Sequence, residues 1–380
     1  MRFMIALLSC LLTSTLASAQ QAPLPVPPPP TVAAKSWVLY DFLAAQVIAS
    51  QNPNERIEPA SLTKMMTAYL TYEALKQKRI TLDQVVPVTP QAWKAPGSRM
   101  FIEPNRPVTV DELIHGMVIQ SGNDACIALA EAIAGSEEVF AQMMNQQALR
   151  LGMKNTNFVN STGLPDPKHY TTAYDMALLA AALIRDFPEH YKLNSQREYR
   201  YNNITQGNRN RLLWTDPYVD GVKTGHHDTA GYCLVASAKR ESRRLISVVT
   251  GTASESARAI ESQKLLNYGF QFYDTVKVYA KDQTVATIRV WKGADNDVRI
   301  GFLNDFYMAL PKGDAARLNA SMETRQPLLA PLTIGQDVGS LKLSIEEKAI
   351  GEYPLVALSN VPVAGIFGRG IDTLRLWIPQ

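Results

Sequence analysis

The sequence predicts an α/β domain followed by a small all-β domain, and three observations carry this expectation. From residue 36 to about residue 273, strand-like and helix-like stretches alternate. From residue 275 to 361, only short strand-like runs occur, with turn residues between them. Hydrophobic residues make up 46% of the 380 residues and charged residues 19%. This is enough apolar material for real cores and excludes a largely disordered chain.

The first domain, placed at residues 35–274, begins with a predicted strand pair at 36–40 and 46–50. The next stretch is apolar on nearly every face, which predicts a buried helix at 62–75. Further helices are expected at 111–120, 123–134, 136–151 and 172–185. Core strands are expected within 220–237 and at 244–251, and residues 267–273 close the domain.

The second domain, placed at residues 275–361, shows no residue pattern that indicates chemistry. Its strands are expected at 276–279, 284–290, 298–301, 306–309, 341–345 and 353–357. We therefore look for the functional site in the first domain.

The N-terminal segment is typical of an exported protein. Residues 1–19 resemble a signal peptide, with Arg2 before an apolar stretch and a small-x-small cleavage site at residues 17–19. A lipoprotein signal ending at Cys10 is a weaker alternative, because that cysteine comes very early. Residues 20–34 are rich in proline and predict an extended tether without chemistry.

The C-terminal segment, residues 362–380, predicts an amphipathic helix. Phe367, Ile371, Leu374 and Ile378 recur at steps of four, three and four residues. The segment is too short to span a bilayer but suits the membrane interface, which predicts peripheral membrane contact. A terminal helix docked on its own domain is the alternative.

Charge and composition exclude several classes of protein. The net charge is +3, so the concentrated basic surface of a nucleic-acid binder is not expected. Five histidines and three cysteines, without HExxH or CxxC spacing, predict neither a metal site nor a cofactor. Cys126 and Cys233 remain after the leader, and we favour free buried thiols over a disulfide.

Three short motifs follow one another along the first domain. They are Ser-x-x-Lys at Ser61 and Lys64, Ser-x-Asn at Ser121 and Asn123, and Lys-Thr-Gly at residues 223–225. Each motif alone occurs by chance in many chains. Their joint occurrence in this order is a strong indication of a serine acyl-transfer site.

The first motif pairs a nucleophile with a base. Ser61 and Lys64 are three residues apart near an expected helix start, so their side chains share one face. A serine hydroxyl needs a base, and no suitable Asp–His pair is evident. Lys64 can serve if burial and a nearby cation such as Lys223 lower its pKa well below the ordinary value. The alternative is a helix cap followed by a solvated lysine.

The other two motifs suit proton relay and substrate binding. Ser121 could pass a proton to a leaving amine and Asn123 could hold a substrate carbonyl, although either could be a plain helix cap. Lys223 and Thr224 suit a substrate carboxylate, and Gly225 would let a substrate backbone approach closely. The alternative is an edge strand with a protective lysine.

The motifs and their surroundings resemble the serine penicillin-binding proteins, and more closely their low-molecular-mass D-alanyl-D-alanine carboxypeptidases (peptidase family S11). The resemblance extends to segments 58–68, 170–177, 220–226 and 331–339 and covers nearly the whole mature chain. It implies a penicillin-binding/β-lactamase-like transpeptidase domain, in which helices flank an antiparallel sheet, and a C-terminal β domain. It also implies a periplasmic enzyme attached peripherally to the outer face of the cytoplasmic membrane.

The resemblance also implies a mechanism and partners. Ser61 would be acylated by the peptidoglycan stem peptide at its D-Ala-D-Ala end, releasing the terminal D-Ala, and by β-lactam antibiotics. Lys64 would be the base, and the backbone N–H groups of Ser61 and His226 would form the oxyanion hole. Arg209 would help Lys223 and Thr224 grip the substrate carboxylate. The residues at 211 and 227 depart from the family pattern.

Two other functions stay open at this point. A serine β-lactamase shares the three motifs, but no Glu-x-x-Leu-Asn loop lies between residues 121 and 223 to position a deacylating water. A non-catalytic, wall-binding morphogenetic protein is the second alternative, although every expected active-site residue is present.

Overall fold

The computed structural model describes residues 26–376 of the chain. The signal-peptide prediction, the first part of the tether and Ile378 lie outside these residues.

In the first domain the strands are β1 (Ser36–Asp41), β2 (Gln46–Gln51), β3 (Val85–Val86), β4 (Val108–Thr109), β5 (Glu198–Tyr201), β6 (Ile204–Gly207), β7 (Val219–His227), β8 (Gly231–Arg240) and β9 (Arg243–Thr252). The helices are η1 (Ala60–Thr63), α1 (Lys64–Lys76), α2 (Pro90–Trp93), α3 (Val110–Val118), α4 (Asn123–Ala134), α5 (Glu137–Arg150), α6 (Ala173–Asp186), α7 (Pro188–Tyr191), η2 (Lys192–Ser195), α8 (Leu212–Thr215) and α9 (Glu255–Phe272).

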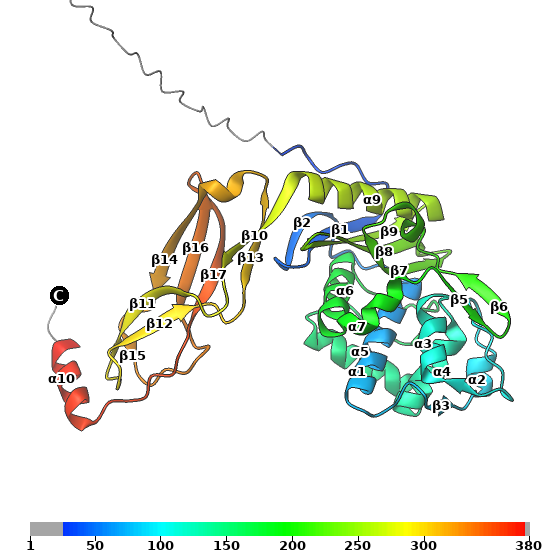
Figure 1. The fold of residues 1–380 in the computed structure, drawn as a ribbon, viewed down its shortest axis with the longest axis horizontal. Coiled ribbons are helices and arrows are strands. Elements are labelled where there is room, and N and C mark those ends of the chain that lie inside the picture. The colour runs from blue at the N-terminus through cyan, green and yellow to red at the C-terminus, as the bar shows by residue number, and fades with distance from the viewer. Residues whose placement is uncertain (1–25, 377–380) are drawn as a thin grey trace, which may run out of the picture.

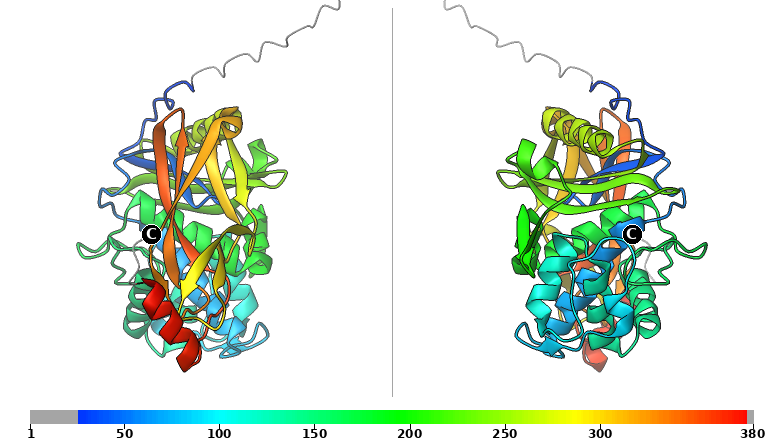
Figure 2. Two further views of the ribbon diagram at one scale, coloured as in Figure 1. Left: turned by 90° about the vertical axis from the view of Figure 1, so that its left-hand side faces the viewer. Right: turned by 90° about the vertical axis from the view of Figure 1, so that its right-hand side faces the viewer.

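The first domain is a sheet between two helical layers, as Figure 1 and the side views of Figure 2 show. Five antiparallel strands follow the order β2-β1-β9-β8-β7. Successive side chains of a strand point to opposite faces, so this sheet contributes to two separate cores. Val235 and Val248 belong to the core shared with the helical region, and Leu234 and Val249 to the core beneath α9. The expected antiparallel sheet with flanking helices is confirmed.

Helix α9 is absent from the sequence-based expectations, which placed only a closing segment at 267–273. Its buried face includes Arg258, Glu261 and Ser262 beside Leu265 and Leu266. Charged and hydroxyl side chains interrupt the apolar stripe on which recognition of a surface helix depends. Arg258 of this helix contacts the Lys-Thr-Gly motif, because its guanidinium donates to the carbonyl of Gly225.

The second domain is all-β, as expected. Its elements are β10 (Tyr273–Tyr279), β11 (Thr284–Trp291), β12 (Asp297–Gly301), β13 (Phe306–Pro311), η3 (Asp314–Arg317), β14 (Leu318–Thr324), β15 (Leu328–Leu329), β16 (Asp337–Ile345) and β17 (Lys348–Ala357). Six strands form one sheet, and β10 pairs with β13. Strand β14 was not predicted, because most of its side chains are exposed and it lacks apolar alternation.

Residues 26–34 correct the prediction of a free tether. They contain no helix or strand, as a proline-rich segment should, but they lie against the first domain. Val32 is buried in the core beneath α9, and Tyr268 of α9 donates a hydrogen bond to the carbonyl of Pro27 at 2.9 Å. This part of the segment is therefore attached along the domain and does not act as a spacer.

Helix α10 (Ile366–Leu376) lies at the end of the second domain that is remote from the first (Figure 1). Its apolar side chains face solvent, with Phe367 91% and Leu374 71% exposed. Its contact with the domain is polar instead, because the buried Asp372 accepts the backbone N–H of Lys292 at 2.7 Å. Within residues 26–376, none of the helices has both the length and the hydropathy needed to cross a membrane.

Cys126 and Cys233 are buried free thiols, which confirms the preference for unpaired cysteines. Burial raises the pKa of the Cys126 thiol to about 12 and that of Cys233 to about 11. Both therefore stay protonated at neutral pH and behave as small apolar side chains.

Candidate active site

Ser61 lies in a tight turn at the entrance to α1. The turn is the 3₁₀ helix η1 (Ala60–Thr63), and α1 begins at Lys64, so Ser61 lies within one short turn of the α-helix. Ala60 has a φ of +46°, a conformation that L residues adopt at a cost. This turn aims Ser61 Oγ at Lys64, whose Nζ lies 2.9 Å away. The predicted shared face of these two side chains is confirmed.

Lys64 is 1% exposed and is surrounded by oxygen atoms. Besides Ser61 Oγ, its Nζ lies 2.7 Å from Asn123 Oδ1 and 2.6 Å from the carbonyl of Thr162. Those two oxygens can only accept hydrogen bonds. A neutral amine has two N–H bonds for them and one lone pair, which then faces the Ser61 hydroxyl. This geometry satisfies the deprotonated lysine as fully as the charged one, so Lys64 can accept a proton from Ser61.

Burial lowers the pKa of Lys64 from its ordinary value to about 8. The positive charge of Arg209 lowers this pKa further, whereas the carboxylates of Asp124 and Glu137 oppose the shift. Arg209 is a cation that was not expected from the sequence, and the predicted neighbour Lys223 also acts on Lys64, because the repulsion between the two ammonium groups is mutual. The pKa of Lys223 is also well below its ordinary value. Burial is the main cause, and the charge of Lys64 adds to it.

Ser121 lies between α3 and α4, Asn123 is the first residue of α4, and neither is a plain helix cap. The N-cap of α4 is Gly122, and no side chain caps that helix. Asn123 instead places Oδ1 on Lys64 and donates from Nδ2 to the carbonyl of Pro96 at 2.6 Å. Ser121 has a φ of +61°, a left-handed conformation that is rare for serine and that the surrounding structure must enforce. The polar segment 121–123, which the sequence places between two buried helices, thus carries residues of the candidate site.

The Lys-Thr-Gly motif lies on β7, one of the two edge strands of the five-stranded sheet. Lys223 Nζ is 3.0 Å from Ser121 Oγ and 6% of the residue is exposed. A Cβ at position 225 would lie 2.9 Å from the carbonyl oxygen of Pro59. The close packing of β7 against the turn that carries Ser61 therefore requires Gly225, a reason different from the predicted approach of substrate backbone.

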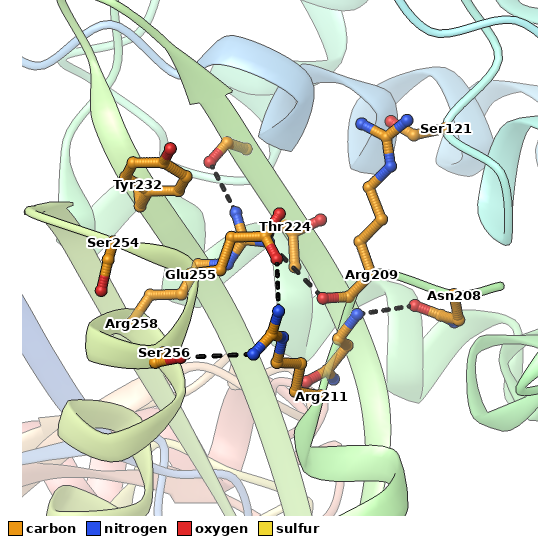
Figure 3. A network of polar contacts seen from close by, with 12 residues as sticks. Ser121, Asn208, Arg209, Arg211, Thr224, Tyr232, Ser254, Glu255, Ser256 and Arg258 are labelled. Carbon is orange, nitrogen blue, oxygen red and sulfur yellow. Dashed lines mark hydrogen bonds and ion pairs between the residues drawn. The ribbon is translucent and has the colours of Figure 1, made fainter.

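These groups open onto a cleft of about 320 Å³. Its lining includes Ser61, Gly97, Ser98, Ser121, Arg209, Thr224, Gly225, His226, Glu255 and Arg258. Figure 3 shows the side chain of Arg209 extending across the cleft toward Ser121, with Thr224 on the neighbouring strand. The guanidinium of Arg209 and the hydroxyl of Thr224 thus border the same cavity as Ser61, and these two groups suit a ligand that carries a carboxylate.

Arg258 of α9 is the site residue that the sequence reasoning missed. It is 3% exposed, and its guanidinium donates to the carbonyl of Gly225 at 3.3 Å and to that of Arg209 at 3.5 Å (Figure 3). It therefore holds two cleft segments together and adds positive charge. No motif marks it, and the apolar pattern of its helix is too irregular to have indicated it.

The two histidines after Lys-Thr-Gly differ in their surroundings. His226 lines the cleft and stacks on Tyr232, with 3.9 Å between the ring centroids. His227 points to Glu58, with Nε2 3.2 Å from the carboxylate, and burial lowers the pKa of His227. The departure from the family pattern at position 227 therefore ties the end of β7 to the segment before Ser61.

The comparisons with known proteins agree with this geometry. A family model described as D-alanyl-D-alanine carboxypeptidase, peptidase S11, matches residues 21–254. The chain belongs to this family. A second model, the C-terminal domain of penicillin-binding protein 5, matches residues 273–363. The resemblance inferred from the motifs is thereby confirmed, and the protein is a serine-type DD-carboxypeptidase of the penicillin-binding class.

Individual relatives of this carboxypeptidase cover most of its length. D-alanyl-D-alanine carboxypeptidase DacC of Escherichia coli is 44% identical over 359 residues, which span 92% of this chain and 90% of the relative. Penicillin-binding protein 5 from Haemophilus influenzae is 40% identical with a TM-score of 0.85, covering 88% of this chain and 99% of that one. Penicillin-binding protein D2 from Listeria monocytogenes, solved in an ampicillin-bound form, is 29% identical with a TM-score of 0.59, covering 64% of this chain and 100% of that one.

Proposed function

We propose that the carboxypeptidase reaction proceeds through an acyl-enzyme on Ser61. The observation that carries the proposal is the 2.9 Å contact between Ser61 Oγ and Lys64 Nζ, in surroundings that suit a neutral amine. Lys64 takes the hydroxyl proton while Oγ attacks the carbonyl of the penultimate D-Ala of a peptidoglycan stem pentapeptide. The backbone N–H groups of Ser61 and His226 stabilise the developing oxyanion.

Ser121 and Lys223 supply the proton that the leaving D-Ala requires. When the C–N bond breaks, the leaving nitrogen needs a proton, and Ser121 Oγ, 3.0 Å from Lys223 Nζ, supplies it along that hydrogen bond. Arg209 and Thr224 hold the D-Ala carboxylate, and Asn123 orients a substrate amide. The proton that Lys64 took passes to Lys223 and Ser121, which replaces the proton given to the leaving nitrogen and leaves Lys64 neutral. Water then attacks the ester while Lys64 accepts a proton from it, and Lys64 returns that proton to Ser61 Oγ as the ester bond breaks. The enzyme thereby limits crosslinking and influences cell-wall structure and cell shape.

A β-lactam reaches the same serine, because its strained amide and carboxylate imitate the D-Ala-D-Ala end. The likeness to the Listeria protein named for its ampicillin-bound form supports this. We expect one adduct per chain after incubation with benzylpenicillin, mapped to the peptide that contains Ser61, and release of D-Ala from a Lys-D-Ala-D-Ala tripeptide analogue. Intact-protein mass and an alanine assay measure the two results.

Ser61→Ala should abolish both the adduct and the release of D-Ala. Ser242→Ala, in the exposed turn between β8 and β9, is the control and should change neither. Hydrolysis of benzylpenicillin in rapid turnover would indicate a β-lactamase instead. Full rescue of a wall defect by Ser61→Ala would indicate a non-catalytic role.

We also propose that the exported protein resides in the periplasm and touches the outer face of the cytoplasmic membrane through α10. The support is the orientation of this helix, whose polar Asp372 faces the second domain while its apolar side chains face solvent. Leu374→Ser should weaken binding to anionic phospholipid vesicles about tenfold or more, since burying one leucine contributes about 1.5–3 kcal/mol. Vesicle co-sedimentation measures the change.

Leu149 provides a matched control for that experiment. It is 72% exposed on α5 of the first domain, compared with 71% for Leu374. Leu149→Ser should leave vesicle binding unchanged, and neither variant should alter turnover of a soluble tripeptide. Equal weakening by both variants would contradict a membrane role specific to α10.

A further inference from the structure

We propose that His169 is a positioning residue for the reaction, holding the nucleophile turn through a hydrogen bond to Thr63. The proposal rests on the proposed acyl-enzyme function of that turn. His169 Nε2 lies 2.8 Å from Thr63 Oγ1, and Thr63 stands between Ser61 and Lys64 in η1. His169 is 3% exposed and Thr63 is fully buried. A buried contact two residues from the nucleophile can fix where its oxygen points.

The tautomer of His169 follows from its other ring nitrogen. The backbone N–H of Val159 donates to Nδ1 at 3.2 Å, so Nδ1 carries a lone pair. A neutral imidazole then carries its proton on Nε2, which donates to Thr63 Oγ1. The edge of Phe158 packs against the ring, with 5.7 Å between centroids. The contacts with Val159, Phe158 and Thr63 thus fix both the plane of the imidazole ring and the direction of its N–H.

The segment 159–164, whose Val159 N–H binds the ring of His169, is held in place by hydrogen bonds of its own. Thr67 Oγ1 donates to the carbonyl of Ser161 at 2.7 Å, and Glu137 accepts both the N–H and the hydroxyl of Ser161. The carbonyl of Thr162 in the same segment holds Lys64. The segment therefore keeps its position without His169, whereas the side chain of Thr63 has only His169 among its side-chain partners in the part of the chain described.

His169 does not serve as the general base for Ser61. Its Nε2–H donates to Thr63, and Nδ1 already accepts from Val159, so neither nitrogen is available to take the serine proton. The charged or titratable groups acting on the ring are Asp166, His227, Lys64 and Glu58. Burial outweighs the two carboxylates and lowers the pKa of His169 to about 4, which keeps the ring neutral during turnover.

Two substitutions separate the two contacts of the ring. The amide of His169→Gln occupies the place of Nε2 and keeps the bond to Thr63. The amide of His169→Asn occupies the place of Nδ1, keeps the bond to Val159 and loses Thr63. Each variant gives up one buried hydrogen bond, so their melting temperatures should fall by similar amounts. His190→Asn, on α7 at the far end of α1, controls for loss of an imidazole.

The measurements are the rate of acylation by benzylpenicillin, and kcat and KM for the tripeptide analogue. We expect the acylation rate of His169→Gln to lie within about threefold of the wild-type rate. The acylation rate of His169→Asn should be lower by about tenfold or more, and its kcat should fall while its KM stays within about twofold of the wild-type value. Equal acylation rates for the two variants, or a loss confined to KM, would overturn the proposal. Absence of any Ser61 adduct in the wild type would instead overturn the proposed function.

Discussion

Lys64→Arg is expected to lower the rate of acylation by benzylpenicillin about 10³-fold. A guanidinium keeps its proton throughout the accessible pH range, so the variant retains a cation beside Ser61 but has no base. General-base catalysis typically contributes 10²–10⁴-fold. Lys76→Arg at the other, exposed end of α1 is the matched control and should acylate at the wild-type rate. More than a tenth of the wild-type rate in Lys64→Arg would contradict the role of Lys64.

The pH dependence of the wild type provides an independent check of the same role. The pKa of Lys64 is lowered to about 8, and the reactive form is the neutral one. The acylation rate should therefore rise about tenfold per pH unit below pH 8 and level off above it, leaving about a tenth of the maximum at pH 7. Lys64→Arg should lack this rise. A wild-type rate that fell between pH 6 and 8 would exclude a lysine base.

Gly163→Ala is expected to be the most destabilising single-methyl change at the site, at about 4 kcal/mol or more. Gly163 has a φ of +86°, and a Cβ there would overlap the carbonyl oxygen of Ala60. The clash is with backbone, so no side-chain rotation relieves it. The neighbouring Ser61 would be displaced as well, and D-Ala release should fall even at temperatures where the variant remains folded.

Gly135→Ala separates the clash from the cost of the backbone conformation. Gly135 has a φ of +80° at the end of α4, and a Cβ there would meet nothing within 4 Å. This control should cost only about 1 kcal/mol, the usual penalty of the left-handed region. Chemical denaturation of both variants measures the difference in the free energy of unfolding. A similar cost for the two would show that Gly163 is needed only for its φ.

The three motifs predicted which side chains lie close together better than the periodicity predicted the helices and strands. Hydrogen bonds join Lys64 to Ser61 and Asn123, and Lys223 to Ser121, although 102 residues separate Lys223 from Ser121. The helix over residues 123–134 was placed correctly because a mostly apolar stretch is bounded there by Gly122 and Gly135. Helix α9 and strand β14 were missed, since polar or exposed side chains remove the apolar period from each.

The sequence by itself determined that Ser61 and Lys64 are neighbours, because two side chains three residues apart on one turn share a face wherever that turn lies. Only the tertiary structure decided what surrounds them. The carbonyl of Thr162 holds Lys64, Arg258 holds Arg209 and Gly225, and His169 holds Thr63. Several of these contacts use backbone atoms, which every residue type possesses, and all join distant segments. Burial by the whole domain likewise sets the pKa of Lys64, and no local pattern of residues encodes it.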